Sequence, residues 1–198
     1  MLPDVKIGMN PRLGLVGVPT WFWVEGYDGD VRVLHDSISA TRQDCHRNVE
    51  RNERGDAVLG EDGAPATHEV CQTFTDTLSV EVRAWPKQYA WDFGDAQAMH
   101  VPCAGETACR QGLGQAFSML AAAGPAGAHI EHAYSWSSLA RNGPLDAYSV
   151  GLGITFGAQF RFGLNSEPNS GWQTLDDRTL SWDDHHQVRE AQAILVRP

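Results

Sequence analysis

The segment from Tyr148 to Phe162 constrains the fold of this chain more than any other part of the sequence. Its even-numbered positions carry apolar side chains, and the positions between them are polar, small or glycine: Tyr148, Val150, Leu152, Ile154, Phe156, Ala158, Phe160 and Phe162. A period of two is that of a strand, because the apolar face of a helix recurs every three or four residues. The segment predicts one long strand, or two joined at a glycine bend, with one face in the core.

Shorter segments repeat this alternation on either side of Pro86. Leu78, Val80 and Val82 are predicted to face the core while Glu81 faces water, and Tyr89, Trp91 and Phe93 restart the pattern after the proline. Alternation returns from Ile130 to Trp136, and a last strand is predicted from about 187 to 196. Residues 13–24 form an extended apolar segment, which Pro19 restricts to an edge or a bent strand.

Polar or helical stretches separate these strands. Residues 39–67 are strongly polar and are predicted to form a long loop or insertion, and residues 96–127 form a second insertion. Within the second, residues 112–123 are the one short helix candidate, which Gly124 and Pro125 would end. Strands spaced by turns, without alternating helices, predict an all-β fold: a single antiparallel β-sandwich domain over residues 1–198.

The charge and hydropathy of the chain exclude two classes of partner. Twenty-five acidic residues against fifteen basic ones give a net charge of −10. Binding to nucleic acid or to an anionic membrane surface needs clustered Lys and Arg, so neither is expected. No stretch reaches the roughly 18 apolar residues that span a bilayer, so no direct membrane span is predicted.

The four cysteines favour disulfides over a metal site. None lies in a C-x-x-C pair, which argues against a zinc ribbon. Cys103 and Cys109 enclose a short polar segment and Cys45 and Cys71 flank a longer one, although other pairings and four reduced thiols stay open. Two disulfides predict an oxidising compartment. The first ten residues do not resemble a signal peptide, so an extracellular chain would need a removed signal or a longer precursor.

The residues Trp91-Asp92-Phe93-Gly94-Asp95 resemble the W-D-F-G-D core of PKD (polycystic kidney disease) domains, which are immunoglobulin-like β-sandwiches. In that family an H-x-Y element and an alternating Y-x-V strand follow, and this chain has His132-Ala133-Tyr134 and then Tyr148-Ser149-Val150. The resemblance covers about residues 77–162. The chain also resembles secreted bacterial proteins that carry a divergent PKD-like domain with a cysteine-bearing insertion after W-D-F-G-D. Cys103 and Cys109 lie at the corresponding place in this sequence. Ala96 departs from the family, which usually has glycine there.

The chemistry of the motif indicates a structural role. Trp91 and Phe93 lie two apart and can fill the core together. Gly94 allows a positive φ, and the carboxylates of Asp92 and Asp95 can accept backbone N–H groups in a turn. The alternative is a Ca²⁺ site, for which two aspartates supply only part of the six to eight oxygens required.

Searches for catalytic patterns find no nucleophile elbow, phosphate loop or complete zinc-protease motif. A run of acids and histidines is interpreted as a solvated loop, with metal binding as the alternative: Asp176, Asp177, Asp183, Asp184, His185 and His186.

His129 and Glu131 are predicted to share one face, with His132 pointing inward beside Tyr134. Trp172, in a polar loop, is the best candidate for an exposed ring that stacks on a sugar.

These observations predict a non-catalytic extracellular or cell-surface module that acts as a scaffold, an adhesive domain or a filament or surface-layer subunit. Its partners would be other proteins or copies of itself, since long strands can add to a neighbour's sheet edge. The alternatives from other classes are a glycan-binding module and, less favoured, a metal-dependent hydrolase. No cofactor other than Ca²⁺ is suggested by any motif.

Overall fold

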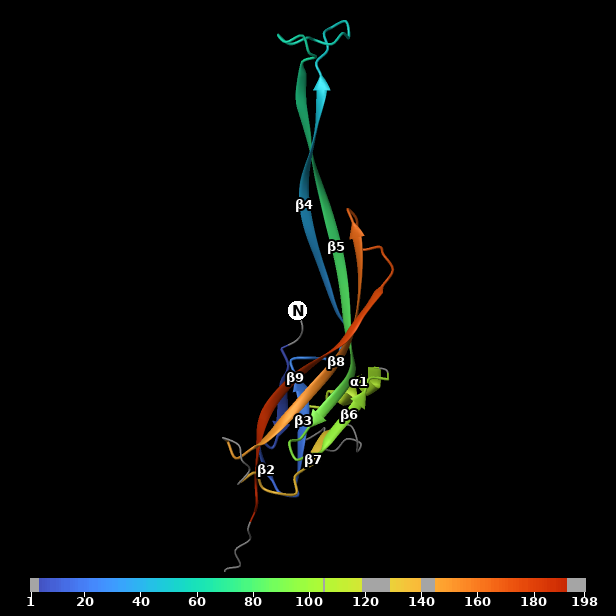
Figure 1. Ribbon diagram of the computed structural model, residues 1–198. Helices are drawn as coiled ribbons and strands as arrows, with labels where there is room; N and C mark the ends of the chain where they lie inside the picture. Colours follow the sequence, from blue (N-terminus) through green and yellow to red (C-terminus); the bar gives the residue numbers. More distant parts are fainter. Residues whose placement is uncertain (1–3, 105, 119–128, 140–144, 192–198) are drawn as a thin grey trace, which may run out of the picture. The chain divides into compact units, whose positions relative to one another are not determined.

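The computed structural model describes residues 4–104, 106–118, 129–139 and 145–191 (Figure 1). Nine strands and one seven-residue helix make up the regular structure of these ranges, which confirms the prediction of an all-β chain. The chain divides into two compact units. We call residues 1–34, 82–160 and 173–198 the core unit, and residues 35–81 with 161–172 the ribbon unit.

The strands form two sheets. One is three-stranded and antiparallel in the order β1-β3-β7, and the other is six-stranded in the order β2-β9-β8-β5-β4, with β6 paired to β5. β2 pairs with β9 in parallel, so this second sheet is mixed and the purely antiparallel prediction is wrong at that pair. The bounds are β1 Lys6–Asn10, β2 Leu13–Leu15, β3 Pro19–Glu25, β4 Arg32–Val49, β5 Thr67–Asp92, β6 Ala98–Pro102, β7 Ile130–Ala133, β8 Tyr148–Leu164 and β9 Gln173–Arg189, with α1 at Glu106–Gly112.

Side chains from both sheets meet in one hydrophobic cluster within the core unit. Phe22 and Ile130 come from the three-stranded sheet, and Trp91 and Leu152 from the other. Trp91 is fully buried and Phe156 is 4% exposed, as the alternation predicts. Burial of these large side chains supplies the main driving force for folding of this unit.

β8 keeps the predicted period of two for only part of its length in the core. Its even-numbered residues are buried from Tyr148 to Phe156, and the pairing with β9 then shifts register between Phe156 and Ala158. Beyond this bulge, Phe162 is 39% exposed, so its predicted place in the core is wrong. Alternation determines which residues share a face of a sheet, but not whether a second layer covers that face.

Two other strand predictions need correction at the N-terminal end. Residues 13–24 form two strands, β2 and β3, separated by a turn in which Gly17 has a φ of +74°. Pro19 opens β3, which is the middle strand of its sheet and not an edge. A proline at the first position of a strand removes no bond from the ladder, which explains why the centre tolerates it.

The predicted loops and helix also differ from the structure. Residues 39–49 belong to β4, so the polar stretch is not one long loop, and β5 runs through Pro86 without a break. The helix ends at Gly112, where it was expected to begin, and residues 113–118 are not helical; residues 119–123 lie outside the described ranges. The last described strand runs over 173–189, so it begins well before the predicted start at about 187, and residues 192–196 lie outside the described ranges. No helix of the described residues is long and apolar enough to cross a membrane.

Candidate interaction surface

The two parts of the W-D-F-G-D and H-x-Y pattern meet in the core unit. The carboxylate oxygen Oδ2 of Asp95 lies 2.8 Å from Nε2 of His132, and both side chains are nearly buried. The ring of Phe93 stacks on the imidazole at 4.3 Å between centroids, and the hydroxyl of Tyr134 donates to the Phe93 carbonyl. The Tyr148 hydroxyl donates to the Trp136 carbonyl. These contacts tie three segments of the chain together.

The aspartates of the motif form the turn that follows β5. Oδ1 of Asp92 accepts the N–H of Gly94 at 2.9 Å, and Oδ1 of Asp95 accepts the N–H of Gln97 at 3.2 Å. Gly94 has a φ of +76°, and a Cβ there would lie 2.4 Å from the Ser149 carbonyl oxygen, so this turn requires glycine. Both oxygens of Asp95 are engaged within the chain, and the geometry is that of a structural turn.

The acid and histidine run lies on β9 and is not a solvated loop. Neighbouring residues therefore alternate between the two faces of the sheet: His186 is fully buried, while His185 is exposed. Nε2 of His186 lies 3.1 Å from the Thr20 hydroxyl, and burial lowers the pKa of His186 to about 4. Asp177 pairs instead with Lys87 at 2.7 Å. The run does not converge on one point, as a metal site would require.

His129 and His132 both pack against aromatic rings. His129 stacks on Trp21 at 3.8 Å between ring centroids, and Glu131 pairs with Trp21 across β3 and β7 with its side chain exposed. His132 points inward beside Tyr134, at 4.5 Å between ring centroids.

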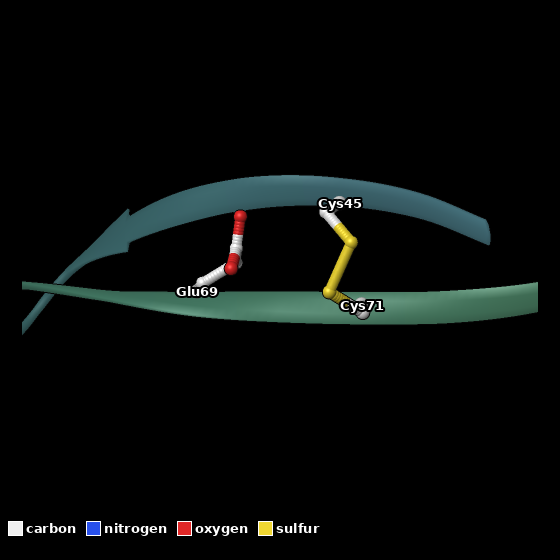
Figure 2. A group of neighbouring side chains, drawn as sticks. All are labelled: Cys45, Glu69 and Cys71. Atoms are coloured by element: carbon white, nitrogen blue, oxygen red, sulfur yellow. A yellow bond between two sulfur atoms is a disulfide. The ribbon is translucent and has the colours of Figure 1, made fainter.

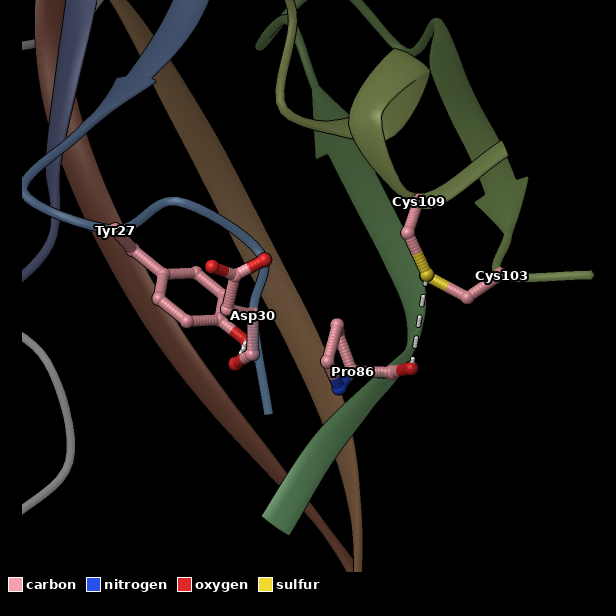
Figure 3. The surroundings of a disulfide bond; sticks show 5 residues. All are labelled: Tyr27, Asp30, Pro86, Cys103 and Cys109. Atoms are coloured by element: carbon pink, nitrogen blue, oxygen red, sulfur yellow. Dashed lines mark hydrogen bonds between the residues drawn. A yellow bond between two sulfur atoms is a disulfide. The ribbon is translucent and has the colours of Figure 1, made fainter. Parts of the chain in front are cut away.

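Both predicted disulfides are present. Cys103–Cys109 joins the residue after β6 to α1 over a sequence separation of six, and Sγ of Cys109 contacts the Pro86 carbonyl oxygen at 3.9 Å (Figure 3). This is a van der Waals contact, since a disulfide sulfur carries no hydrogen. Cys45–Cys71 joins β4 to β5, with the Glu69 carboxylate beside it (Figure 2). Those two sulfurs and the carboxylate have metal-like spacing, but the sulfurs are bonded to each other. Two disulfides indicate an environment outside the cytosol.

β4 and β5 form a long twisted pair in the ribbon unit, and cross-strand contacts fix its register (Figure 1). Ser39 hydrogen-bonds Thr77 at 2.8 Å, Thr41 lies opposite Thr75, and Cys45 is bonded to Cys71. Odd-numbered residues therefore share one face, which is largely a ladder of hydroxyl groups: Ser37, Ser39, Thr41, Thr73, Thr75, Thr77 and Ser79.

The opposite face of the ribbon unit is apolar and exposed. Its even-numbered residues on β4, β5 and the end of β8 include Ile38, Phe74, Leu78, Phe162 and Leu164, each between 39% and 68% exposed. We call these five residues the apolar row. On the hydroxyl side, Glu81 is buried and pairs with Arg161. The sequence predicted that Leu78 faces the core and Glu81 faces water, so the predicted orientation of β5 is wrong at this end. Contiguous exposed apolar side chains are unusual on a protein surface, which makes the apolar row a candidate contact surface.

β4 also has an open edge, because it is the last strand in its sheet. All its eighteen residues are exposed and none is glycine or proline. The Cα atoms of Cys45 and Cys71 are 4.1 Å apart, the spacing of a non-hydrogen-bonded pair, while the N–H of Glu50 donates to Ala66. Odd-numbered residues of β4 therefore direct their N–H and C=O groups away from β5. No described strand pairs with them.

The tryptophans are distributed differently from the prediction. Trp172 is half-buried, with the Arg161 guanidinium 4.7 Å above its ring, so one face of the indole is covered. Trp136, which the alternation placed in a strand, lies beyond the end of β7 and is 73% exposed. Trp85 lines a hollow of about 410 Å³ in the core unit, together with Asp28, Asp30 and the Cys103–Cys109 disulfide.

The comparisons with family models, with curated proteins and with solved structures found no match for this chain.

Sequence reasoning missed the ribbon unit as a surface. Its signal is present in the chain, since hydroxyl residues alternate with Ile38 and Ala40 on β4 and with Leu78 on β5. A strand with one polar and one partly polar face shows only a weak alternation of hydrophobicity. Such a sequence resembles that of a loop unless the partner strand is known.

Proposed function

We propose that this chain is a non-catalytic structural module of the cell surface or extracellular space, with a PKD-like, immunoglobulin-like core unit. In this proposal the ribbon unit makes the contact with protein partners or with other copies. The observation that carries it is the combination, on β4 and its neighbours, of an open strand edge with the exposed apolar row. Strand edges bind through main-chain hydrogen bonds, and alternate side chains supply specificity.

Several contacts support a permanent role for the ribbon unit. The Cys45–Cys71 bond, the Ser39–Thr77 hydrogen bond and the Glu81–Arg161 pair hold the strands together without a hydrophobic core. A stapled strand pair that leaves its apolar side in water is costly unless another surface covers it. The oxidised cysteines and the acidic surface agree with an extracellular setting.

The test uses the full chain on its producing cell. Limited proteolysis of intact cells should remove the chain, whereas a cytosolic marker should survive. A triple variant, Ile38→Thr with Leu78→Thr and Leu164→Thr, should keep the thermal midpoint of unfolding within a few degrees but lose retention at the surface. Retention unchanged in this variant, or a chain protected inside intact cells, would contradict the proposal.

The hollow beside Trp85 favours one second candidate, a glycan-binding module. The Arg83 guanidinium lies 5.9 Å from the Trp85 ring centroid, so the other face of the indole would serve for stacking, and the two carboxylates beside it offer acceptors for sugar hydroxyls. A glycan array with the Trp85→Ala variant as control tests it: binding that depends on Trp85 supports the candidate, and no binding removes it.

A further inference from the structure

We propose that β4 pairs with β4 of a second copy of this chain, antiparallel and centred on Ser39, to form a symmetric dimer with a sheet that continues through both ribbon units. This inference deepens the proposed function, on which it rests, by naming the partner and the register. It starts from the open edge of β4, whose outward N–H and C=O groups belong to odd-numbered residues.

The backbone allows this pairing. In an antiparallel pair of identical strands about Ser39, residue 37 lies opposite 41 of the second copy and residue 35 opposite 43. All of these are odd-numbered, so their outward groups can exchange hydrogen bonds in pairs. β4 contains no glycine or proline, so every residue along this edge carries an N–H donor. In the single chain the Ser37 N–H donates to Oδ1 of Asp36 at 2.8 Å, and pairing would exchange that bond for one to the Thr41 carbonyl of the second copy while the Asp36 carboxylate turns to Arg42.

The charges along β4 are self-complementary about the same centre. Asp36 lies three residues before Ser39 and Arg42 three residues after it. Antiparallel pairing therefore places Asp36 of each copy opposite Arg42 of the other, twice per dimer. Protected edges usually carry charges that repel a second strand, whereas this edge carries opposite charges at matched distances.

The apolar row favours the same arrangement. A two-fold axis through Ser39 and perpendicular to the sheet leaves the same face of both copies on one side. Ile38 of each copy then lies opposite Ala40 of the other, beside Leu78 of its own chain. The pairing joins two exposed apolar rows into one larger surface, so the dimer offers a broader contact than the single chain.

Arg42 is placed for this role within its own chain. Its guanidinium lies 5.1 Å from the Phe74 ring centroid and its Nε 3.5 Å from Asp76. These contacts hold the positive charge on the apolar side of β4, on the same face as Asp36, where the carboxylate of a second copy would meet it.

Sedimentation of the full chain over a concentration series tests the proposal. The unchanged chain should form a reversible dimer. Asp36→Arg and Arg42→Asp each place two like-charge pairs across the axis and should raise the dissociation constant about tenfold or more. The double variant D36R/R42D should restore it to within about threefold, because the opposite charges then meet again.

Asp44→Arg is the matched control. It makes the same charge change on the same face, but Asp44 would lie opposite Leu34 of the second copy, so the dissociation constant should change little. If D44R weakens the dimer as much as D36R, or if the double variant fails to restore it, the Ser39-centred register is wrong.

A crosslink locates the axis independently. Opposed residues in a hydrogen-bonded pair have Cα atoms about 5.5 Å apart, within reach of a disulfide. Ser39→Cys should therefore form a covalent dimer under mild oxidation, while Ser37→Cys alone and Thr41→Cys alone should not. A chain that remains monomeric at all concentrations overturns the dimer, and surface retention that still depends on the apolar row would then leave the proposed function standing.

Discussion

Leu152 and Leu164 lie on the same strand, β8, at positions of the same parity, yet one is 1% exposed and the other 63% exposed. The first belongs to the core unit and the second to the ribbon unit. The core unit is held by a continuous cluster of buried aromatic and aliphatic side chains. The ribbon unit is held by a disulfide, cross-strand hydroxyl contacts and ion pairs such as Glu81–Arg161 and Asp76–Arg42. The comparison shows that one alternating pattern can supply the core of one unit and an exposed apolar surface of another.

The largest expected effect separates these two leucines. Leu152→Ala removes side-chain volume from a filled core and should lower the free energy of unfolding by about 3–4 kcal/mol. Leu164→Ala, its matched control, should change it by less than about 0.5 kcal/mol, because that side chain loses little burial. Urea denaturation followed by tryptophan fluorescence measures both. Equal losses would mean that residue 164 is covered, contrary to the structure.

Removal of each disulfide distinguishes the units in a second way. Cys45→Ala with Cys71→Ala opens a loop of 26 residues and should cost the ribbon unit about 3 kcal/mol. Hydrogen exchange should rise across residues 35–81 while residues 148–156 stay protected. Cys103→Ala with Cys109→Ala, over six residues, should cost about 2 kcal/mol and act on the core unit. Exchange that rises equally everywhere after the first change would show that the units do not open separately.

The sequence predicted the strands of the core unit around Trp91 and Leu152 better than it predicted the ribbon unit. Strict alternation around Leu152 and the aromatic pair Trp91 and Phe93 are local signals of a buried strand face. The cysteine spacing suggested the Cys103–Cys109 disulfide but left other pairings open. The alternation of hydroxyl and apolar residues on β4 is a weaker signal, because a strand without a buried face shows only a short and incomplete apolar period. Its strand structure depends on cross-strand partners such as Thr77 and Cys71, which lie 26 or more residues away.

The motif and its surroundings show the same limit. The sequence suggested that Asp95 and His132 belong to one pattern, but their contact depends on how β7 packs against the turn after β5. The burial of His186 was also not predicted. In a strand, adjacent residues face opposite sides, so one histidine of a His-His pair points inward, and local sequence does not say which.

The buried His186 should make stability depend on pH. Its pKa is about 4 in the folded chain and near 6.5 when unfolded, so only the unfolded state takes up the proton between these values. Above pH 6.5 the effect is absent. As the pH falls from 6.5 to 4, the folded state should lose about 3 kcal/mol.

Denaturation at pH 7.5, 5 and 4 measures this loss, and His186→Leu should lack it. His185→Gln is the control, since that side chain is exposed on the other face. If the leucine variant does not fold, the ring signals of His186 in the unchanged protein should still report a neutral imidazole down to about pH 4. A ring that becomes charged near pH 6.5 would contradict the burial.

The smallest expected effect concerns two tyrosines of the core unit. The Tyr89 hydroxyl is buried without a hydrogen-bond partner among the described residues, whereas the Tyr134 hydroxyl donates to the Phe93 carbonyl at 3.2 Å. Burial raises the pKa of both phenols, which therefore stay neutral.

Tyr89→Phe should leave stability unchanged or raise it by up to about 1 kcal/mol, because it removes a buried polar group that lacks a partner. Tyr134→Phe should lower stability by about 1 kcal/mol through loss of its hydrogen bond. Thermal denaturation of both variants measures the difference, and a destabilising Tyr89→Phe would mean that this hydroxyl is hydrogen-bonded in the folded chain.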